Sequence, residues 1–187
     1  MGVVAVLYYL PEPSVRRPAG ELVPDEPSQS PARADEWTYR RYHLTSKAFF
    51  SVRARVLLKD PYWFGRESDL SPLDLTVGWG LMSDQRVLEQ FQMYRGHRRF
   101  WLQPETAYAR LKSAEALRHA ANIHLIPATA ELEKQLKSVR RGNIVDLKGR
   151  LVNVQGDDGW TWHTSLSRED TGDGACELMW VEWARVN

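Results

Sequence analysis

Cys176 is the only cysteine in the chain, and its type alone would allow nucleophilic chemistry. A cysteine becomes a nucleophile when a histidine or a helix N-terminus lowers the pKa of its thiol and when solvent reaches it. His124 and His163 are the candidate bases, because each lies in a stretch expected to form a strand of the same sheet. Together these residues would suit a hydrolase that attacks through sulfur.

The same cysteine also fits a place in the core. Free cysteine is among the most buried residue types and behaves as a small hydrophobe. Leu178 and Trp180 follow Cys176 at a spacing of two, which is typical of one face of a strand. We therefore expect Cys176 to point into the core. The catalytic set of Cys176 with His124 or His163 is kept as an alternative.

A second group of polar residues would suit binding without catalysis. The glycines on both sides of Trp79 would let the backbone approach a ligand or another strand closely, and the residues after them would then bind a ligand or cap a helix. The loop that ends at the last strand is rich in acids. We expect the binding surface where these segments meet, formed by Trp79, Ser83, Asp84, Asn122, His124, Asp170, Asp173 and Glu177.

The sequence predicts no metal site and no cofactor. Its five histidines have neither H-x-x-x-H nor H-E-x-x-H spacing, and its acidic loops do not match an EF-hand. One cysteine excludes an internal disulfide and a thiolate-rich zinc site.

Nucleic acid is an alternative ligand. Residues 93–101, MYRGHRRFW, interleave basic and aromatic side chains, and Trp160 and Trp162 would stack bases on an exposed sheet. The formal net charge is only +1, however, and phosphate contacts dominate such affinity. A module that binds single-stranded nucleic acid on an OB-like barrel is therefore the weaker alternative.

Composition indicates one globular domain preceded by an extension. The chain has 187 residues, of which 43% are hydrophobic and 26% charged. Residues 2–10 are apolar but too few for a membrane-spanning helix, which needs about 20 residues, and they lack the features of a signal peptide. We expect an edge strand, a tucked-in tail or the remnant of an anchor, which leaves membrane contact through residues 2–10 open.

The helices and strands that must position these residues are predicted from hydrophobic periodicity and from the prolines and glycines that interrupt it. Residues 1–36 are expected to form the apolar segment and a proline-rich linker, and residues 37–187 a single α+β domain. Residues 49–58 alternate as a half-buried strand. The pair Ser71-Pro72 resembles the start of a short helix that ends at Gly78, and a second short helix is expected from Ser83 or Asp84.

The remaining chain predicts two longer helices and a β-rich end. The helices are expected at 105–121 and 129–139, and strands at 98–103 and 122–127. After Gly149 the apolar positions change phase, which is typical of a bulge. The fold class is therefore α+β: a curved antiparallel sheet with an OB-like barrel in the C-terminal half, two or three helices and a proline-rich N-terminal strap.

Several blocks resemble a family of uncharacterised bacterial proteins. They are DLSPLDLTVGWGLMSD at 69–84, NIHLIPA at 122–128, RGNIVDLKGRLVNV at 141–154 and DTGDGACELMWVE at 170–182. The resemblance covers roughly residues 17–183. It implies an N-terminal membrane-anchoring segment, a proline-containing linker and one extracytoplasmic domain, and it carries no assigned activity.

We therefore expect a non-catalytic binding or accessory domain, tethered at the bacterial cell envelope rather than cytoplasmic. Its partner would be an unknown protein or small molecule. The alternatives are the hydrolase that uses Cys176 with a histidine base and the module that binds single-stranded nucleic acid.

Overall fold

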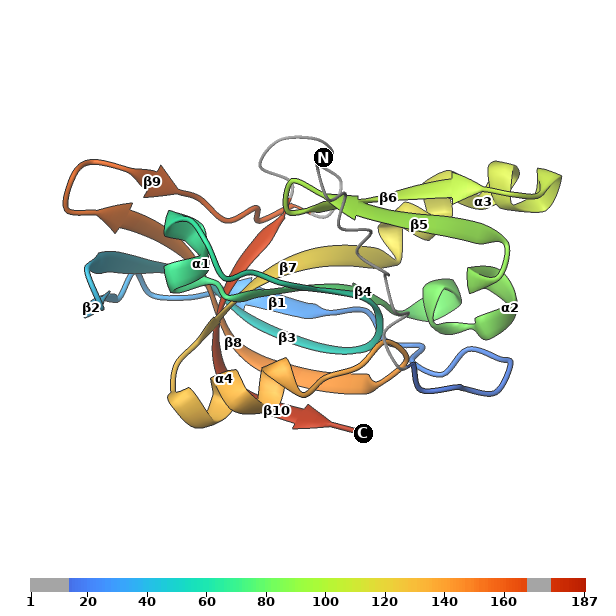
Figure 1. The fold of residues 1–187 in the computed structure, drawn as a ribbon, viewed down its shortest axis with the longest axis horizontal. Coiled ribbons are helices and arrows are strands. Elements are labelled where there is room, and N and C mark those ends of the chain that lie inside the picture. Colours follow the sequence, from blue (N-terminus) through green and yellow to red (C-terminus); the bar gives the residue numbers. More distant parts are fainter. Residues whose placement is uncertain (1–13, 168–175) are drawn as a thin grey trace, which may run out of the picture.

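The computed structural model describes residues 14–167 and 176–187, which form a mixed α+β domain dominated by one curved sheet (Figure 1). Its pairings form a circuit: each strand is bonded to the next, and the last returns to the first. In that order the strands are β3 (Tyr42–Pro61), β4 (Leu73–Gly78), β7 (Ala120–Pro127), β10 (Glu177–Val186) and β8 (Ile144–Gly156).

Short strands extend this circuit at its edges. Strands β1 (Ser28–Pro31) and β2 (Glu36–Tyr39) both pair with β3, and β9 (Thr161–Trp162) pairs with β8. Strands β5 (Phe91–Gly96) and β6 (Arg99–Pro104) form a separate two-stranded hairpin between β4 and β7 in the sequence.

The described residues contain four α-helices, where two or three were expected. They are α1 (Arg66–Leu70), α2 (Gln85–Leu88), α3 (Ala107–Arg118) and α4 (Ala130–Lys137), and a 3₁₀ turn, η1 (Gly80–Ser83), precedes α2. Helices α1 and α2 have only one turn each, and such turns leave little periodicity for a sequence pattern to reveal.

Alternation along β3 builds the main core. Phe50, Val52, Ala54 and Val56 are each at most 3% exposed and belong to one apolar cluster. The strand predicted at 49–58 is confirmed, and it extends further in both directions.

The helix expected from Ser71 to Gly78 is wrong, because this stretch forms β4. Leu73, Leu75 and Val77 lie in the main core at a spacing of two, and this alternation outweighs the helix-start signal of the preceding Ser-Pro pair. Ser71 instead ends α1. The correction matters because it places Asp74 on the outer face of the sheet.

The expectation of a wholly antiparallel sheet is also wrong. Strand β10 runs parallel to β7, with Glu177 opposite Ile123, and antiparallel to β8. The chain leaves β7 through α4, forms β8, and then returns between these two strands. That return path forces β10 to run in the same direction as β7.

At Gly149, β8 approaches β10 closely, whereas the sequence pattern predicted a bulge at this residue. A Cβ atom at this position would lie 1.9 Å from the carbonyl oxygen of Trp180 in β10. The register shift lies opposite, between Val181 and Trp183 of β10. The change of apolar phase reflects burial on both faces, because Leu151 joins the main core and Val152 a second cluster.

The two longer helices are confirmed, and α3 buries small side chains rather than its large apolar ones. Tyr108, Leu111 and Leu117 are 53%, 85% and 43% exposed, whereas Ala109 and Ala116 are fully buried. Helix α3 covers the β5–β6 hairpin at the periphery, where small side chains allow close contact.

The proline-rich strap packs against the domain. Val23 is 1% exposed within the main core, and its backbone N–H, like that of Leu22, donates a hydrogen bond to the Ser83 hydroxyl. The N–H of Gly20 donates to the carboxylate of Asp84. The strap therefore contributes to the fold of the residues that follow it.

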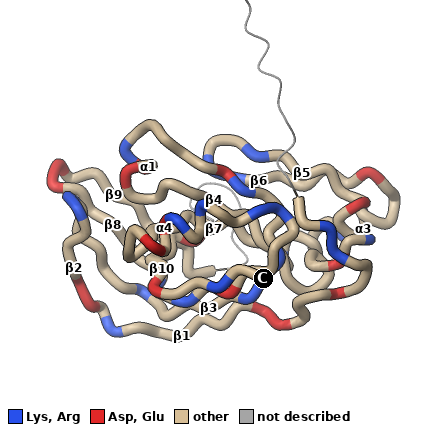
Figure 2. Tube along the Cα trace, turned by 60° about the horizontal axis from the view of Figure 1, so that its bottom comes forward, with Lys and Arg blue, Asp and Glu red and all other residues tan. Residues whose placement is uncertain are grey.

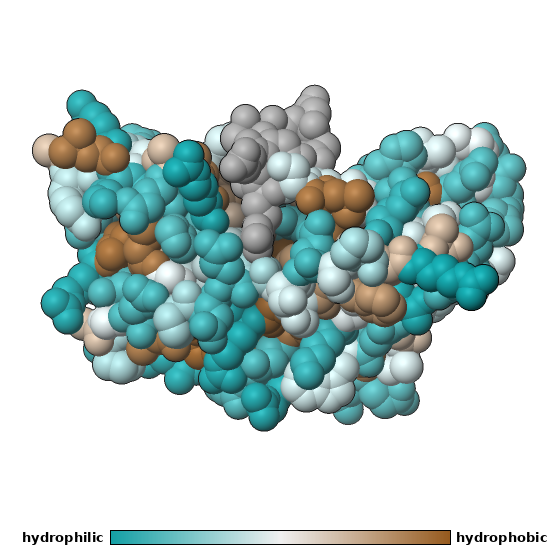
Figure 3. Space-filling model, turned by 180° about the vertical axis from the view of Figure 1, so that it is seen from behind, coloured by the Kyte–Doolittle hydropathy of each residue, from teal (hydrophilic) through white to brown (hydrophobic). Residues whose placement is uncertain are grey.

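The surface is mixed in character. Acidic and basic residues are interspersed along the trace in Figure 2. The view in Figure 3 is mostly hydrophilic with separate apolar patches. No helix among residues 14–167 and 176–187 is long and apolar enough to cross a membrane.

Candidate functional site

A row of polar side chains lies on the outer face of β4 and β7. Asp74 pairs in register with His124, and Thr76 pairs with Asn122. All four side chains are buried, at 1–6% exposure. The Thr76 hydroxyl donates to the Asn122 carbonyl at 3.2 Å. Buried polar groups are costly unless they are paired, so this row needs partners from the segments that cover it.

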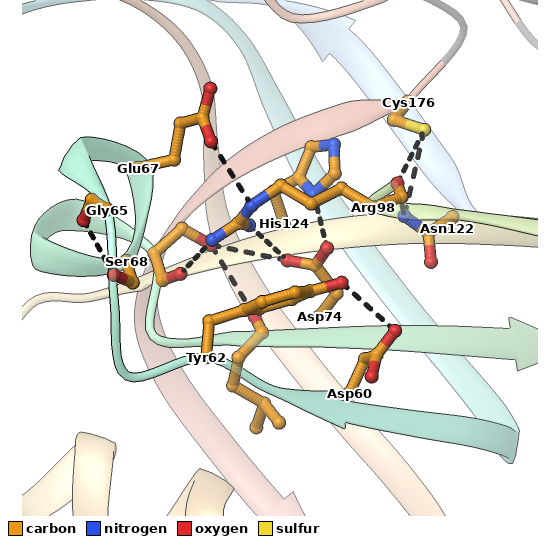
Figure 4. Close-up of polar contacts among 12 residues, drawn as sticks. Asp60, Tyr62, Gly65, Glu67, Ser68, Asp74, Arg98, Asn122, His124 and Cys176 are labelled. Carbon is orange, nitrogen blue, oxygen red and sulfur yellow. Dashed lines mark hydrogen bonds and ion pairs between the residues drawn. The ribbon is translucent and has the colours of Figure 1, made fainter. Parts of the chain in front are cut away.

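The Asp74 carboxylate is the centre of this row (Figure 4). One of its oxygens lies 2.9 Å from Nδ1 of His124. The other accepts a hydrogen bond of 2.8 Å from Arg98, whose guanidinium also donates to the carbonyl of Ser71. The carboxylate is thus hydrogen-bonded to the Arg98 guanidinium, whereas its second oxygen and Nδ1 of His124 lie close together without a hydrogen bond that satisfies either of them.

Arg98 reaches Asp74 from the turn of the β5–β6 hairpin. His97 and Arg98 form this two-residue turn with positive φ angles of 48° and 59°. Such turns favour Asn and Gly, because other side chains are strained in the left-handed region. Arg98 is therefore unfavourable for the backbone of this turn, but its side chain makes the contact with Asp74.

Aromatic rings enclose the Arg98 guanidinium. Its central carbon lies 3.9 Å from the ring centre of Tyr62 and 5.3 Å from that of Trp162. Glu67 of α1 lies 3.7 Å from its Nε. Burial raises the pKa of the Tyr62 hydroxyl, and the nearby carboxylates of Asp74 and Asp60 raise it further. Tyr62 therefore stays neutral and donates to Asp60.

Above this network lies a cavity of about 420 Å³, here termed the β7 cavity. Its lining comes from four places far apart in the sequence: α1, the hairpin turn, the segment around β9, and β7 with the residue that precedes β10. The lining residues are Glu67, His97, Arg98, Arg99, His124, Thr161, Trp162, His163 and Cys176.

Trp162 forms a wall of the β7 cavity. Strand β9 holds it in place, and its ring centre lies 4.8 Å from that of His124. Trp160 contacts it edge to face at 6.0 Å. The wall combines an apolar ring with an indole N–H, which suits a ligand that has both polar and apolar surfaces.

Cys176 lines the β7 cavity and is half-buried. Leu178, two residues on, is fully buried in the second apolar cluster, so the period of two is as expected, and only the cavity beside the sulfur was not predicted. The sulfur lies 3.6 Å from the Asn122 amide nitrogen. Burial raises the pKa of the thiol to about 11, although the Asn122 contact opposes this. The thiol is therefore protonated near neutral pH.

The structure brings some of the sequence candidates together. His124, His163 and Cys176 line one cavity, and Asn122 contacts Cys176. Glu177 is buried at 5% exposure beside them in β10. Asp170 and Asp173 lie outside the described residues.

Trp79, Ser83 and Asp84 do not line the β7 cavity. Trp79 and Ser83 are at most 1% exposed, and Trp79 follows the opposite end of β4 from Asp74. Ser83 accepts hydrogen bonds from the strap, and Asp84 caps α2. Their contacts hold the strap and start a helix.

Sequence reasoning missed Asp74, Tyr62 and Glu67, and treated Arg98 and Trp162 only as a nucleic-acid surface. The expected helix at 71–78 hid the outward position of Asp74. The signal was present in Leu73-Asp74-Leu75-Thr76-Val77, where a polar residue follows each leucine.

Within the described ranges, no group of three or more His, Cys, Asp or Glu residues is placed to hold a metal ion. The β7 cavity instead offers imidazoles, a hydroxyl, an indole and charges that are already paired. Comparisons of the chain with protein-family models, with curated proteins and with solved structures found no match, so the family resemblance stays a prediction.

Proposed function

We propose that this protein is a non-catalytic binding domain whose β7 cavity takes a small polar ligand. The observation that carries the proposal is a cavity of about 420 Å³ over the Arg98–Asp74 ion pair, with the His124 imidazole 2.9 Å from the same carboxylate. Small-molecule sites typically measure roughly 300–1,000 Å³ and combine apolar walls with a few fixed polar groups. Trp162 supplies such a wall, and the network keeps the polar groups in place.

The strand order supports an OB-like barrel as the scaffold. In that fold, ligands bind over the second and third strands and the neighbouring loops. Counted from β3 around the circuit, the second and third strands are β4 and β7. The β7 cavity lies at their outer face, and its walls come from the connections between strands. Its position thus matches the ligand position expected of an OB-like domain.

Charge pairing indicates the class of ligand. Arg98 contacts both Asp74 and Glu67, and Arg66 nearby contacts Asp158. A polyanion would have to compete with these carboxylates. A neutral or zwitterionic molecule would instead use the imidazoles and Thr161 for hydrogen bonds and Trp162 for stacking.

Nuclear magnetic resonance with a panel of small polar compounds tests this proposal. The full chain would be titrated with sugars, amino acids and nucleosides at millimolar concentration. We expect at least one compound to shift the indole N–H signal of Trp162 in a saturable manner. Trp183, 42% exposed on β10, is the matched control, because it lies outside the cavity. Equal shifts at both indoles, or none at Trp162 with any compound, would refute the proposal.

A hydrolase is the second candidate, and one observation favours it. The Asp74–His124 pair orients an imidazole in the same cavity as the only thiol, which is the arrangement of an activated nucleophile. The raised pKa of Cys176 argues against activation. The pH dependence of the alkylation rate of native Cys176 distinguishes the two candidates. An inflection of this rate well below about pH 8.5 supports a hydrolase, and an inflection near pH 11 supports a binding domain without catalysis.

Nucleic-acid binding and envelope attachment stay predictions with separate tests. The interspersed charges in Figure 2 weaken the first, because phosphate contacts dominate such binding. We expect no anisotropy change with a labelled oligothymidine at low salt. The apolar segment 2–10 lies outside the described residues, and vesicle sedimentation of the full chain against a chain that lacks residues 2–10 tests its attachment.

A further inference from the structure

A second cavity, of about 560 Å³, shares no lining residue with the first and is rich in arginine. It is termed the strap cavity, because the strap forms one side of it. Arg16 and Arg17 come from the strap, Arg55 from β3, and Arg141 from the turn before β8. Glu89 is the one acidic side chain in its lining. Its lining charge is therefore strongly positive.

Arg55 is the unusual member of this set, because it is only 5% exposed. Its terminal nitrogens donate to the carbonyl of Ser83 and to the side chain of Gln85. Its Nε is buried and has no hydrogen-bond partner among the described residues. Burial lowers the pKa of this guanidinium, and the like charges of Arg141 and Arg17 lower it further, while the carboxylates of Asp84 and Glu89 oppose the shift.

No described carboxylate forms an ion pair with Arg55. Asp84 accepts hydrogen bonds from the backbone of Gly20 and Arg86, and the exposed Glu89 accepts one from Gln85. A buried cation without a contacting anion costs several kcal/mol in effective terms. An anion bound in the cavity would offset that cost.

Hydrogen bonds to the turn at Arg141 and Gly142 hold the strap against this cavity. The N–H of Val15 donates to the carbonyl of Arg141 at 2.7 Å, and Arg17 donates to that of Gly142 at 2.8 Å. Gly142 has a φ of 87°, and a Cβ there would lie 2.0 Å from the carbonyl oxygen of Val15. The fold thus keeps Arg16 and Arg17 close to Arg141, although like charges repel.

The other side of the strap cavity is apolar. Val56, Leu57, Leu88 and Phe91 line it, and each is at most 7% exposed. Its volume is in the range of organic ligands rather than of a bare ion. The cavity therefore suits a molecule with an anionic group at one end and an apolar or neutral part at the other.

We propose that the strap cavity binds the phosphate group of an organic ligand, with Arg55 donating through Nε and Arg17 and Arg141 adding positive charge. Guanidinium groups match the geometry of phosphate oxygens and remain charged in buried sites. Two sources share this chemistry, a lipid headgroup and a soluble phosphate ester. The headgroup is within reach of the apolar segment 2–10, because Leu10 lies four positions before Ser14, a length of chain that spans at most about 14 Å.

The first test is a titration of the full chain with inorganic phosphate at constant ionic strength. We expect a saturable rise in Tm and a saturable shift of the Arg55 Nε–H signal in nuclear magnetic resonance spectra. A response no larger than that to the same ionic strength of chloride would overturn the proposal.

A pair of neighbouring variants makes this test specific. Arg140 and Arg141 are both exposed, but only Arg141 lines the cavity. We expect Arg141→Gln to weaken phosphate binding about tenfold, the value of one charge-assisted hydrogen bond, and Arg140→Gln to leave it unchanged. Equal losses in the two variants would overturn the site. Arg55→Met should abolish saturation; if it fails to fold, the exposed pair still decides.

Vesicle sedimentation distinguishes the two sources. For a lipid headgroup, binding to phosphatidylglycerol vesicles should exceed binding to phosphatidylcholine vesicles, and Arg141→Gln but not Arg140→Gln should reduce it. For a soluble ester, phosphate should bind in solution while vesicle binding is the same in both variants. Either result supports the site, provided that the phosphate titration has saturated.

Discussion

The β7 cavity and the strap cavity each contain a largely buried arginine on the outer side of the sheet, but these two arginines contact different groups. Arg98 contacts the carboxylates of Asp74 and Glu67 and stacks on Tyr62. Arg55 contacts a carbonyl and an amide, and the charged side chains that line its cavity are mostly other arginines.

This difference teaches that burial of an arginine does not by itself indicate an anion site. At the β7 cavity the charge is balanced inside the protein, so the site is stable when empty and suits a ligand without strong charge. At the strap cavity the balance is incomplete, and an external anion would complete it. The groups that contact a buried guanidinium therefore indicate whether its cavity suits an anionic ligand.

The largest expected effect is at the centre of the balanced site. Asp74→Asn would leave Arg98 and His124 facing each other without their carboxylate, because breaking a buried ion pair leaves an uncompensated charge. We expect a loss of about 3–5 kcal/mol in the free energy of unfolding, measured with urea. A loss below about 1 kcal/mol would show that this network is not held by its charges.

Removing each arginine tests the contrast directly. Arg98→Met would leave a buried carboxylate with one partner and should destabilise the fold by roughly 3 kcal/mol. Arg55→Met would lose two hydrogen bonds but relieve repulsion and desolvation, so its net effect should stay within about 1 kcal/mol of zero. Urea midpoints of the two variants, taken at the same low salt, provide the measurement. Equal losses would remove the distinction between the two cavities.

The thiol of the β7 cavity predicts a dependence of stability on alkaline pH. Its pKa is raised from an ordinary value of 9.0 to about 11, so the folded state holds this proton more tightly than the unfolded chain. The stabilisation is complete below pH 9 and is lost as pH rises through 11, by roughly 2 kcal/mol in total. The wild type should lose this amount relative to Cys176→Ala across that window. A constant difference between the two proteins would place the thiol in contact with water.

The smallest effect on stability is expected for an arginine–aspartate pair that is exposed to solvent. Arg66 and Asp158 form a pair near the rim of the β7 cavity, with side chains 33% and 55% exposed. Asp158→Asn should leave the urea midpoint almost unchanged, because solvent screens surface pairs. A loss comparable with that of Asp74→Asn would mean that burial is not what separates the two pairs.

Local pattern predicted much of the fold and little of the site. The helical spacing at 105–121 and 129–139 and the alternation of residues 49–58 are short-range signals, and the elements they predict are present. Asp74 was missed because a Ser-Pro pair outweighed five alternating residues. The parallel alignment of β10 with β7 was missed because no local pattern records which strand a segment will join.

The sequence by itself determined the class of the domain, the long helices, the strand at its centre and the three chemically suggestive residues His124, His163 and Cys176. Only the tertiary structure decided that these three line one cavity, that Arg98 closes over Asp74, and that Arg55 forms an ion pair with none of the described carboxylates. The physical reason is that charge pairing depends on contacts between residues such as Asp74 in β4 and Arg98 in the β5–β6 turn, which are 24 positions apart.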